Sequence, residues 1–158
     1  MPVEVRKATR DDAEKIAEFA ILLSKQHRDY DKDRFIAFSD IDGAAWFYGE
    51  QTEADDAAIL IAEIDGKPVG FAYLQYEARN YAALLENAVW LHDIYVDAAA
   101  RGTGAGKALI EASADAAKQL GAVKLMLSVA ARNLIGQEFF ERAGFRTTML
   151  EMMLKLPA

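Results

Sequence analysis

The segment that most restricts the fold of this chain is Arg101-Gly102-Thr103-Gly104-Ala105-Gly106-Lys107, which has three glycines within five residues. The apolar stretch before it, residues 88–96, predicts a strand. Apolar residues then recur at helical spacing over residues 104–120, and Gly121 is a typical helix end. A strand that turns through glycines into a helix directs unpaired backbone N–H groups outward, which suits an anion such as phosphate. The alternative is a tight turn that needs glycine for packing only.

Two common phosphate motifs do not match this loop. The P-loop requires glycine five positions before its Gly-Lys pair and Ser or Thr after it, where this chain has Arg101 and Ala108. The dinucleotide pattern G-x-G-x-x-G requires glycine at the position of Lys107. The spacing therefore excludes both nucleotide-binding motifs.

The remaining pattern predicts a mixed α/β fold around one sheet, in one domain spanning residues 1–158. Strands are predicted at residues 3–6, 57–64, 69–76, 88–96, 124–129 and 147–156. Helices are predicted at residues 9–26, 104–120 and 134–143, with a weaker one within 31–38. Asp65-Gly66-Lys67 predicts a hairpin turn, residues 77–86 an excursion between strands, and residues 40–56 show no clear pattern.

Composition narrows the possible functions. The chain has no cysteine, which excludes disulfides, a thiol catalyst and cysteine-based metal sites, and we expect no metal. A net charge of −7 argues against general nucleic-acid binding, and it suits either a cationic substrate or solubility alone. No apolar signal region and no run of about 18 apolar residues is present, so we expect a cytoplasmic protein without membrane contact.

The glycine-rich loop resembles the R-x-x-G-x-G signature of the GNAT superfamily of N-acetyltransferases through Arg101, Gly104 and Gly106. Three other segments also resemble that family, namely Leu91-His92-Asp93-Ile94-Tyr95-Val96-Asp97, Asn133 with Phe139-Phe140-Glu141-Arg142-Ala143-Gly144-Phe145, and Val5-Arg6-Lys7-Ala8-Thr9-Arg10-Asp11-Asp12-Ala13. The resemblance runs over residues 3–156, with gaps at 40–56 and 77–86. It implies the GNAT fold, a central mixed and mostly antiparallel sheet flanked by helices.

The resemblance also implies a cosubstrate, acetyl-CoA. Backbone amides of the 101–107 loop would bind its pyrophosphate, and residues 94–96 would pair with its pantetheine arm. A backbone N–H near Val96 would polarise the thioester carbonyl. The residues assigned in this way to the cosubstrate are Ile94, Tyr95, Val96, Arg101, Gly102, Thr103, Gly104, Ala105, Gly106, Lys107, Asn133, Phe139 and Phe140.

The acceptor amine must lose a proton before it attacks, so a base or a water relay is expected. Leu91-His92-Asp93 resembles the Leu-Glu-Asp of diamine acetyltransferases, with His92 in place of the glutamate. A histidine titrates near neutrality and is able to serve as this base, although a structural role on the sheet is equally open. Asp93 is the second candidate, as a base or as an anchor for a cationic amine.

One residue departs from the family pattern. The second aromatic of the F-Y-x-x-x-G-F segment is commonly a tyrosine that protonates the leaving thiolate, and here it is Phe140. Tyr95 or a water is then expected to supply the proton, or the thiolate leaves unprotonated. The aromatic residues 46–48 either line the acceptor site or pack in the core, and core packing is favoured. The methionines of residues 149–153 are expected to pack in the terminal strand.

Three functions remain open at this point. The first is acetyl transfer from acetyl-CoA to a primary amine of a small molecule or peptide. The second is a weakly catalytic acyl-CoA-binding module, which Phe140 makes conceivable. The third, a toxin that acetylates charged tRNA, is disfavoured by the charge of −7. The apolar C-terminal strand is compatible with a homodimer.

Overall fold

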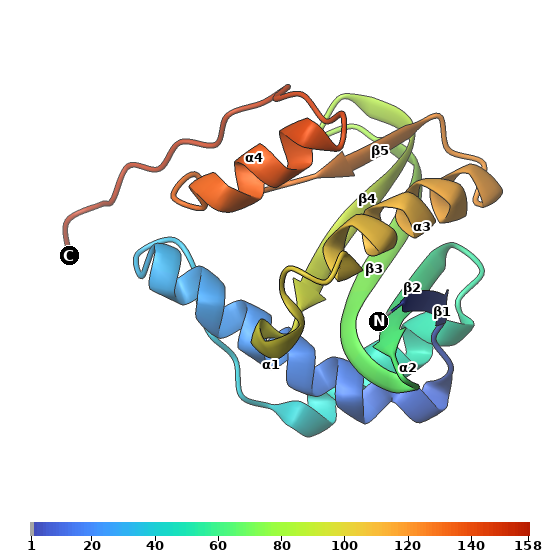
Figure 1. The fold of residues 1–158 in the computed structure, drawn as a ribbon. Coiled ribbons are helices and arrows are strands. Elements are labelled where there is room, and N and C mark those ends of the chain that lie inside the picture. Colours follow the sequence, from blue (N-terminus) through green and yellow to red (C-terminus); the bar gives the residue numbers. More distant parts are fainter. Residues whose placement is uncertain (1) are drawn as a thin grey trace.

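The computed structural model describes residues 2–158 and contains one five-stranded sheet in the order β1-β2-β3-β4-β5 (Figure 1). The strands are β1 (Val3–Lys7), β2 (Ala57–Ile64), β3 (Lys67–Asn80), β4 (Leu85–Val96) and β5 (Lys124–Leu127). The first four pair antiparallel in sequence order, and β5 pairs parallel to β4. The predicted mixed, mostly antiparallel sheet is confirmed.

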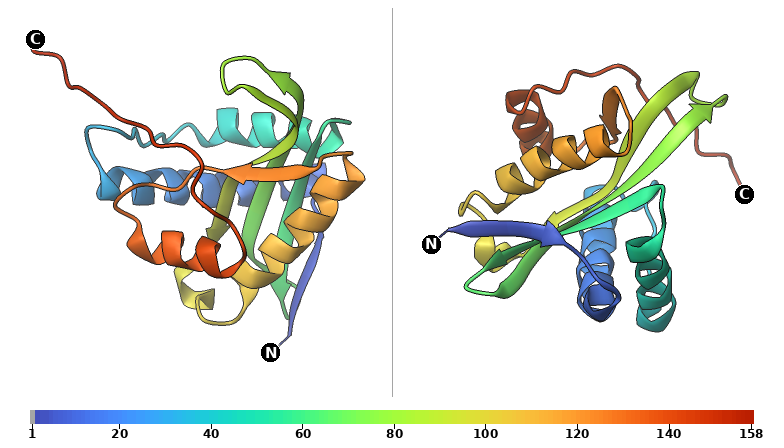
Figure 2. Two further views of the ribbon diagram at one scale, coloured as in Figure 1. Left: turned by 90° about the horizontal axis from the view of Figure 1, so that it is seen from above. Right: turned by 90° about the vertical axis from the view of Figure 1, so that its right-hand side faces the viewer.

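Helices cover both faces of this sheet, as the two views of Figure 2 show. On one face lie α1 (Ala13–Tyr30) and α2 (Ile41–Glu53), and on the other lie α3 (Ala105–Gln119) and α4 (Leu134–Arg142). Two short 3-10 turns, η1 (Arg10–Asp12) and η2 (Ala98–Ala100), precede α1 and α3. A three-layer arrangement of this kind buries both faces of the sheet.

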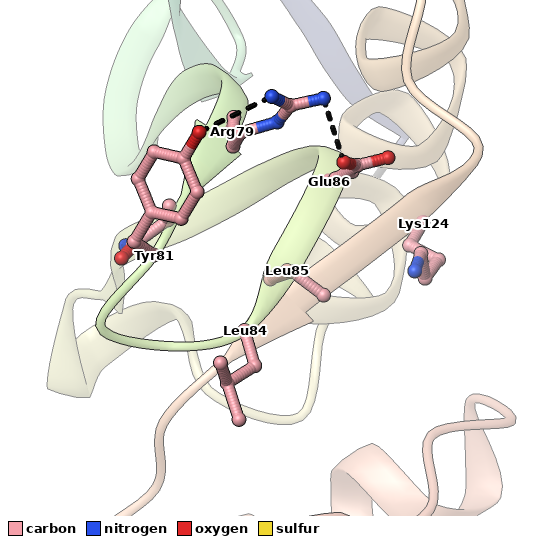
Figure 3. A pocket seen from close by; sticks show the side chains of 7 residues that line it. Arg79, Tyr81, Leu84, Leu85, Glu86 and Lys124 are labelled. Atoms are coloured by element: carbon pink, nitrogen blue, oxygen red, sulfur yellow. Dashed lines mark hydrogen bonds and ion pairs between the residues drawn. The ribbon is translucent and has the colours of Figure 1, made fainter.

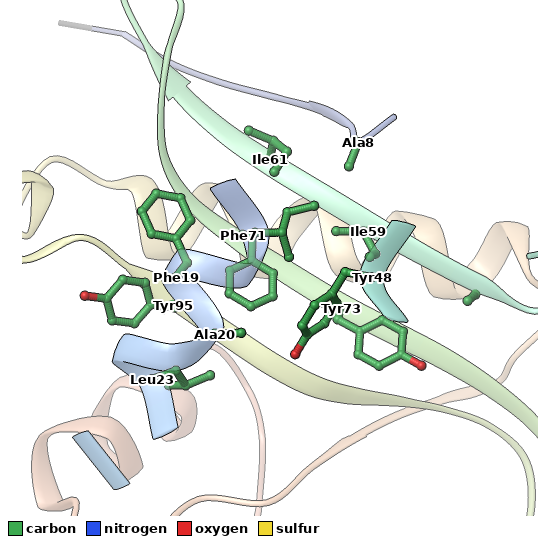
Figure 4. Packing of buried hydrophobic residues seen from close by; sticks show 12 residues of the cluster. Ala8, Phe19, Ala20, Leu23, Tyr48, Ile59, Ile61, Phe71, Tyr73 and Tyr95 are labelled. Atoms are coloured by element: carbon green, nitrogen blue, oxygen red, sulfur yellow. The ribbon is translucent and has the colours of Figure 1, made fainter. Parts of the chain in front are cut away.

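Each face has its own apolar cluster. On the α1/α2 face, fully buried Ile16, Ile61 and Phe71 pack with Phe19 and three tyrosines, and Figure 4 shows how these side chains meet between the helices and the strands. On the α3/α4 face, Leu74 and Leu109 are fully buried. The continuous apolar run of β2 is explained because consecutive residues of a strand face opposite sides, and here both sides are covered.

The loop between α1 and α2 differs from the prediction. The predicted helix within residues 31–38 is wrong, since α1 itself continues to Tyr30 and ends at Asp31 in an extended conformation, φ −156°. The Asp31 side chain accepts hydrogen bonds from the backbone N–H groups of Asp33 and Arg34, which favours a turn over a helix. The unpatterned residues 40–56 hold α2, whose two buried residues give it almost no readable periodicity.

Strand lengths also differ. The predicted excursion at residues 77–86 is largely strand, because β3 continues to Asn80 and β4 begins at Leu85. The predicted strand at residues 147–156 is wrong for the single chain, which has no secondary structure there. No strand among residues 2–158 lies beside this segment to accept its backbone hydrogen bonds, and its methionines are exposed instead of packed. The core prediction is likewise wrong for Trp46, which is 67% exposed.

Candidate active site

The glycine-rich loop leads directly into the first turn of α3. Gly104 is the N-cap of this helix in a left-handed conformation, φ +89°, and Gly102 has φ +80°. A Cβ atom added at either glycine would find no protein atom within 4 Å, so this side of the loop faces open space. No side chain caps the helix, and its first backbone N–H groups are left for a ligand. A hydrogen bond of 2.5 Å from the Thr103 Oγ1 hydroxyl to the carbonyl of Ala100 stabilises the loop.

Two cations flank the loop. Lys107 lies 4.0 Å from Glu111 in an exposed pair one helical turn on, a separation at which solvent screens most of the attraction. Arg101 is exposed and forms no ion pair with any other residue in the 2–158 range. Together with the N-terminus of α3, these charges make the loop an electropositive surface on a chain of net charge −7.

Beside the loop, β4 has a free edge. Strand β5 pairs with β4 only up to Leu91, opposite Leu127. On its other side β4 stays paired with β3 as far as Val96, opposite Gly70. The backbone N–H of Asp97 donates to the carbonyl of Val69 at 2.7 Å. Because hydrogen bonding alternates along an antiparallel pair, the N–H groups of Ile94 and Val96 point away from β3, toward the free edge.

A β-bulge in β4 lies at His92. The register between β3 and β4 shifts there, because Leu74 pairs with Leu91 and Tyr73 with Asp93, which leaves His92 as the extra residue. Neighbouring residues of a regular strand face opposite sides, but the bulge turns His92 and Asp93 to the same α1/α2 face. The His92 ring lies 5.6 Å from that of Tyr73, and Asp93 bonds to Tyr48 of α2. The sequence names His92 and Asp93 as candidate bases. The bulge explains how the side chains of two adjacent residues lie on one face of the strand.

Asp93 is a half-buried carboxylate with one phenolic partner. The Tyr48 hydroxyl donates to its Oδ2 at 2.7 Å. Burial raises the pKa of Asp93, while the hydrogen bond from Tyr48 and the nearby His92 and His27 act in the opposite direction. Burial, together with the Asp93 charge, raises the pKa of Tyr48, so this phenol remains a donor. An elevated carboxyl pKa next to a titratable histidine is a typical arrangement for proton transfer.

Aromatic rings surround this carboxylate. Tyr48 and Tyr73 have ring centroids 5.8 Å apart, and Phe47 lies 5.8 Å from Tyr73. Burial, with Asp93 and Asp56 nearby, raises the pKa of Tyr73 to about 12. Sequence reasoning missed Tyr73 altogether. It favoured core packing over the acceptor site for Tyr48, which is indeed buried in the α1/α2 cluster but also bonds to Asp93, and nothing in residues 40–56 indicates that contact. The only available signal was the cluster of aromatic residues 46–48 itself.

His27 also belongs to this neighbourhood. Its Nδ1 donates to the carbonyl of Leu23 at 2.9 Å, and its ring packs edge-on against Phe35 at 5.0 Å. His27 lies in the last turn of α1, where a cation is favourable, and it is also near enough to Asp93 to favour the ionised form of that carboxyl. Two histidines therefore lie near Asp93 on the α1/α2 side of β4.

Tyr95 lies on the same face, nearer to the glycine-rich loop. Its ring is 8% exposed and packs 5.6 Å from that of Phe19. Figure 4 shows the Tyr95 hydroxyl pointing away from the rings of Tyr48 and Tyr73. Burial and the Asp97 carboxylate raise the pKa of Tyr95, which keeps its proton in place at neutral pH.

The three predicted residues of the α4 region have different surroundings. Asn133 caps α4, with its Oδ1 accepting from the N–H of Gly136 at 2.9 Å. Phe139 packs against the loop, because a Cβ at Gly106 would lie 3.2 Å from its ring. Phe140 lies between Phe139 and Phe145, at ring distances of 5.3 and 5.9 Å. Phe139 thus explains why position 106 is glycine, whereas Asn133 and Phe140 have structural partners within the protein.

An open hollow of about 410 Å³ lies elsewhere, at the hairpin between β3 and β4 (Figure 3). Arg79 bridges its rim, with Nη2 2.9 Å from Glu86 and Nη1 donating to the Tyr81 hydroxyl at 3.2 Å. This hollow lies at the start of β4, whereas the glycine-rich loop follows the end of the same strand. It is therefore separate from the site described above.

None of the helices between residues 2 and 158 combines the length and the apolar character needed to cross a membrane. Within the same range, no three His, Asp or Glu side chains are grouped so that they could hold a metal ion.

Comparison with known proteins places this arrangement among acetyltransferases. Residues 16–145 match the model of the acetyltransferase (GNAT) family. An uncharacterized N-acetyltransferase of Bacillus subtilis is 30% identical over 158 residues, covering 99% of each chain. An uncharacterized N-acetyltransferase of Methanocaldococcus jannaschii is 31% identical over 143 residues, or 89% of this chain, and this chain covers 59% of that relative's length.

Solved structures share the fold at lower sequence identity. A variant of a Bacillus halodurans protein superposes with a TM-score of 0.84 at 19% identity, covering 97% of this chain and 99% of the other. An aminoglycoside N-acetyltransferase in complex with CoA superposes with a TM-score of 0.80 at 21% identity, covering 99% and 96%. These likenesses confirm the predicted fold.

Proposed function

We propose, since the chain belongs to the acetyltransferase (GNAT) family, that it transfers the acetyl group of acetyl-CoA directly to a primary amine of a small molecule or peptide. One observation supports an amine as the acceptor. The bulge at His92 brings a half-buried carboxylate and a histidine to one face of β4, beside a free strand edge that leads to the glycine-rich loop.

The cosubstrate fits along β4 and the loop. The pyrophosphate of acetyl-CoA binds the open N–H groups at the start of α3, with Arg101 and Lys107 adding positive charge. The amide groups of pantetheine pair with the free edge at Ile94 and Val96, in the manner of an added strand. The outward N–H of Val96 then polarises the thioester carbonyl as negative charge develops on its oxygen.

The acceptor amine binds on the α1/α2 side of β4. A protonated amine is attracted both to the Asp93 carboxylate and to the faces of the surrounding aromatic rings. Asp93 or His92 accepts the proton that the amine must lose, and the neutral nitrogen attacks the thioester carbon. The carbon–sulfur bond then breaks with its electron pair on sulfur, the nitrogen loses its second proton to solvent, and the acetyl group forms an amide with the nitrogen. No covalent enzyme intermediate is needed.

The leaving thiolate takes a proton from Tyr95 or from water. Phe140 has no proton to give, and its ring is packed between two others. Tyr95 is protonated at neutral pH, because its pKa is raised. Its place on β4, between the two residues that pair with pantetheine, supports the role.

A panel of amines tests this function against the binding-module alternative. We expect release of CoA thiol with at least one class of primary amine, together with a mass increase of one acetyl group on that amine. Because the chain has no cysteine, a thiol reagent reports CoA alone. A protein that binds acetyl-CoA but releases no thiol with polyamines, aminoglycosides, amino acids or peptide N-termini would contradict the proposal.

Replacing Tyr48 with phenylalanine tests the role of Asp93 through pH. The Tyr48 hydrogen bond favours the ionised carboxylate, so its loss raises the pKa of Asp93 further. If Asp93 is the base, the acid limb of the kcat/KM profile moves upward by about one to two pH units, since a hydrogen bond to a charged group contributes roughly 1.5–3 kcal/mol. Tyr73→Phe is the matched control, because the Tyr73 hydroxyl bonds to Gln51 and Gln75 instead. An acid limb that stays in place in Tyr48→Phe would assign the base elsewhere.

A further inference from the structure

Trp90 lies on β4 close to the candidate bases, but the packing of the fold does not explain it. Its neighbours Val89 and Leu91 face the α3/α4 cluster, so Trp90 faces the α1/α2 side of the sheet, as Asp93 does. Among residues 2–158 it is a member of neither apolar cluster, and its side chain is only partly buried. Its indole N–H is covered, yet it has no hydrogen-bond partner within the same residues. Because a buried donor without a partner lowers stability, the large ring must have another use.

A row of aromatic rings runs along this face of the sheet. The rings of Trp90 and His92 are 6.4 Å apart and within 18° of parallel, and those of His92 and Tyr73 are 5.6 Å apart at 32°. Phe47 of α2 adds a fourth ring, edge-on to that of Tyr73 at 5.8 Å. We call these four residues the aromatic row. Since His92 and Phe47 are exposed, a ligand can reach the row from solvent.

The aromatic row meets a single carboxylate, that of Asp93. The charged groups that influence the pKa of Asp93 are His92 and His27, and no second carboxylate within residues 2–158 raises it. Asp56 also lies near the row, but it is exposed, precedes β2 two strands away from β4, and accepts a hydrogen bond from Gln75 at 3.0 Å. An acceptor bound at Asp93 therefore extends along aromatic rings. There an additional ammonium group gains less from an exposed cation–π contact than an aromatic ring gains from burial.

The spacing along β4 limits the size of the acceptor. Two to three residues at about 3.3 Å each separate Asp93 from Trp90, which is roughly 7–10 Å. An ammonium group that bonds to the carboxylate and is joined through two carbons to an aromatic ring covers a span of this length. The ring then lies between Asp93 and the far end of the row.

We propose that the acceptor is a 2-arylethylamine, with its amine at Asp93 and its ring stacked in the aromatic row against Trp90. This inference rests on the proposed acetyl transfer to a primary amine and narrows it. The same chemical unit occurs in simple aromatic monoamines and in peptides whose first residue is aromatic. Stacking covers the open faces of the rings and leaves the edge of the His92 imidazole, where its nitrogens lie, free for the amine proton.

Thiol release from acetyl-CoA compares amines that differ in one group. We expect kcat/KM for 2-phenylethylamine to exceed that for butylamine and for diaminobutane at least about 10-fold, because stacking and burial of one ring supply the corresponding 1.4 kcal/mol. The amides of phenylalanine, alanine and lysine repeat the comparison for a peptide N-terminus. Preference for phenylalanine amide alone assigns a peptide acceptor, and preference for 2-phenylethylamine alone assigns a small monoamine. Faster reaction of diaminobutane and lysine amide would overturn the inference while leaving the proposed acetyl transfer intact.

Two substitutions test Trp90 itself. Trp90→Leu keeps an apolar side chain but removes the ring, so KM for 2-phenylethylamine should rise about 10-fold while KM for butylamine and for acetyl-CoA stays the same. Trp90→Phe restores a ring and should recover most of the affinity. Trp46→Leu is the matched control, because Trp46 is 67% exposed and precedes the buried Tyr48 by two residues, which turns it away from the sheet. A Trp90→Leu protein that keeps the preference for the aromatic amine would contradict the assignment.

Tryptophan fluorescence measures binding without turnover. The chain has two tryptophans, so Trp46→Phe leaves Trp90 as the only one. With CoA present, 2-phenylethylamine should change the emission of Trp90 in a saturable way and butylamine should not. The Trp90→Phe protein, which retains Trp46, should show no change. Absence of thiol release with every amine would contradict the proposed function, and a saturable change at Trp90 would still support the aromatic site. No change at Trp90 would overturn the inference.

Discussion

Replacing Gly104 with valine is expected to abolish the stabilisation of the protein by acetyl-CoA. Saturation at about 100 times Kd should add roughly 2.7 kcal/mol to the free energy of unfolding of the unmodified chain. Gly104 has φ +89°, a conformation that β-branched residues strongly avoid, and its Cβ would enter the open space in front of the α3 N-terminus. The valine would both distort the loop and occupy the position of the phosphate.

A second glycine provides the control for this measurement. Gly66, in the turn between β2 and β3, has φ +74° and also has no protein atom within 4 Å of an added Cβ. Gly66→Val therefore introduces comparable backbone strain, of the order of 1–3 kcal/mol, far from the loop. Denaturant unfolding with and without acetyl-CoA should show a destabilised protein that keeps the full ligand effect. A Gly104→Val protein that keeps the ligand effect as well would exclude the loop as the phosphate site.

Replacing Asp93 with asparagine is expected to lower kcat/KM by about 100-fold or more while leaving the protein at least as stable at neutral pH. The loss of activity follows if the carboxylate accepts the amine proton or anchors the cationic amine. Asparagine has a similar shape and still accepts the hydrogen bond from Tyr48. His92→Ala should lower kcat/KM by a similar factor if the histidine is the base instead.

The direction in which Asp93→Asn changes the free energy of unfolding follows from the pKa of Asp93. Burial raises the pKa of Asp93 in the folded protein above its value of about 3.9 in the unfolded chain. The ionised carboxylate therefore destabilises the fold, with an effect that begins as pH rises through the unfolded value and is complete above the folded one. Asp93→Asn should thus match the unmodified protein near pH 3 and equal or exceed its free energy of unfolding near pH 8.

Unfolding at several pH values and steady-state kinetics check these expectations. An Asp93→Asn protein that is clearly less stable at pH 8 would show that the carboxylate has a structural role instead. If Asp93→Asn and His92→Ala both keep the original rate and the same acid limb, neither side chain is the base. The variant that removes the acid limb identifies the residue that accepts the proton.

Local sequence patterns predicted the parts of this protein that depend on neighbours along the chain. A continuous apolar run located β2, and helical spacing located α3 and α4, each to within one or two residues of the observed ends. The spacing of Arg101, Gly104 and Gly106 identified the loop and the family, because backbone conformation at a glycine-rich turn is largely a local property. The resemblance of Leu91-His92-Asp93 to diamine acetyltransferases stays a prediction.

Tertiary structure decided what depends on segments distant in sequence. The phenol beside Asp93 comes from α2, whose mixed surface gives no periodic signal, and the shared face of His92 and Asp93 comes from a register shift against β3. Residues 147–156 also show that a local residue pattern does not by itself determine secondary structure. Their alternation is strand-like, yet a strand forms only where a partner accepts its hydrogen bonds, and the single chain places none beside them. Sequence thus determined the glycine-rich loop for which we propose cosubstrate binding, whereas packing between distant elements determined which side chains share one face of β4 with Asp93.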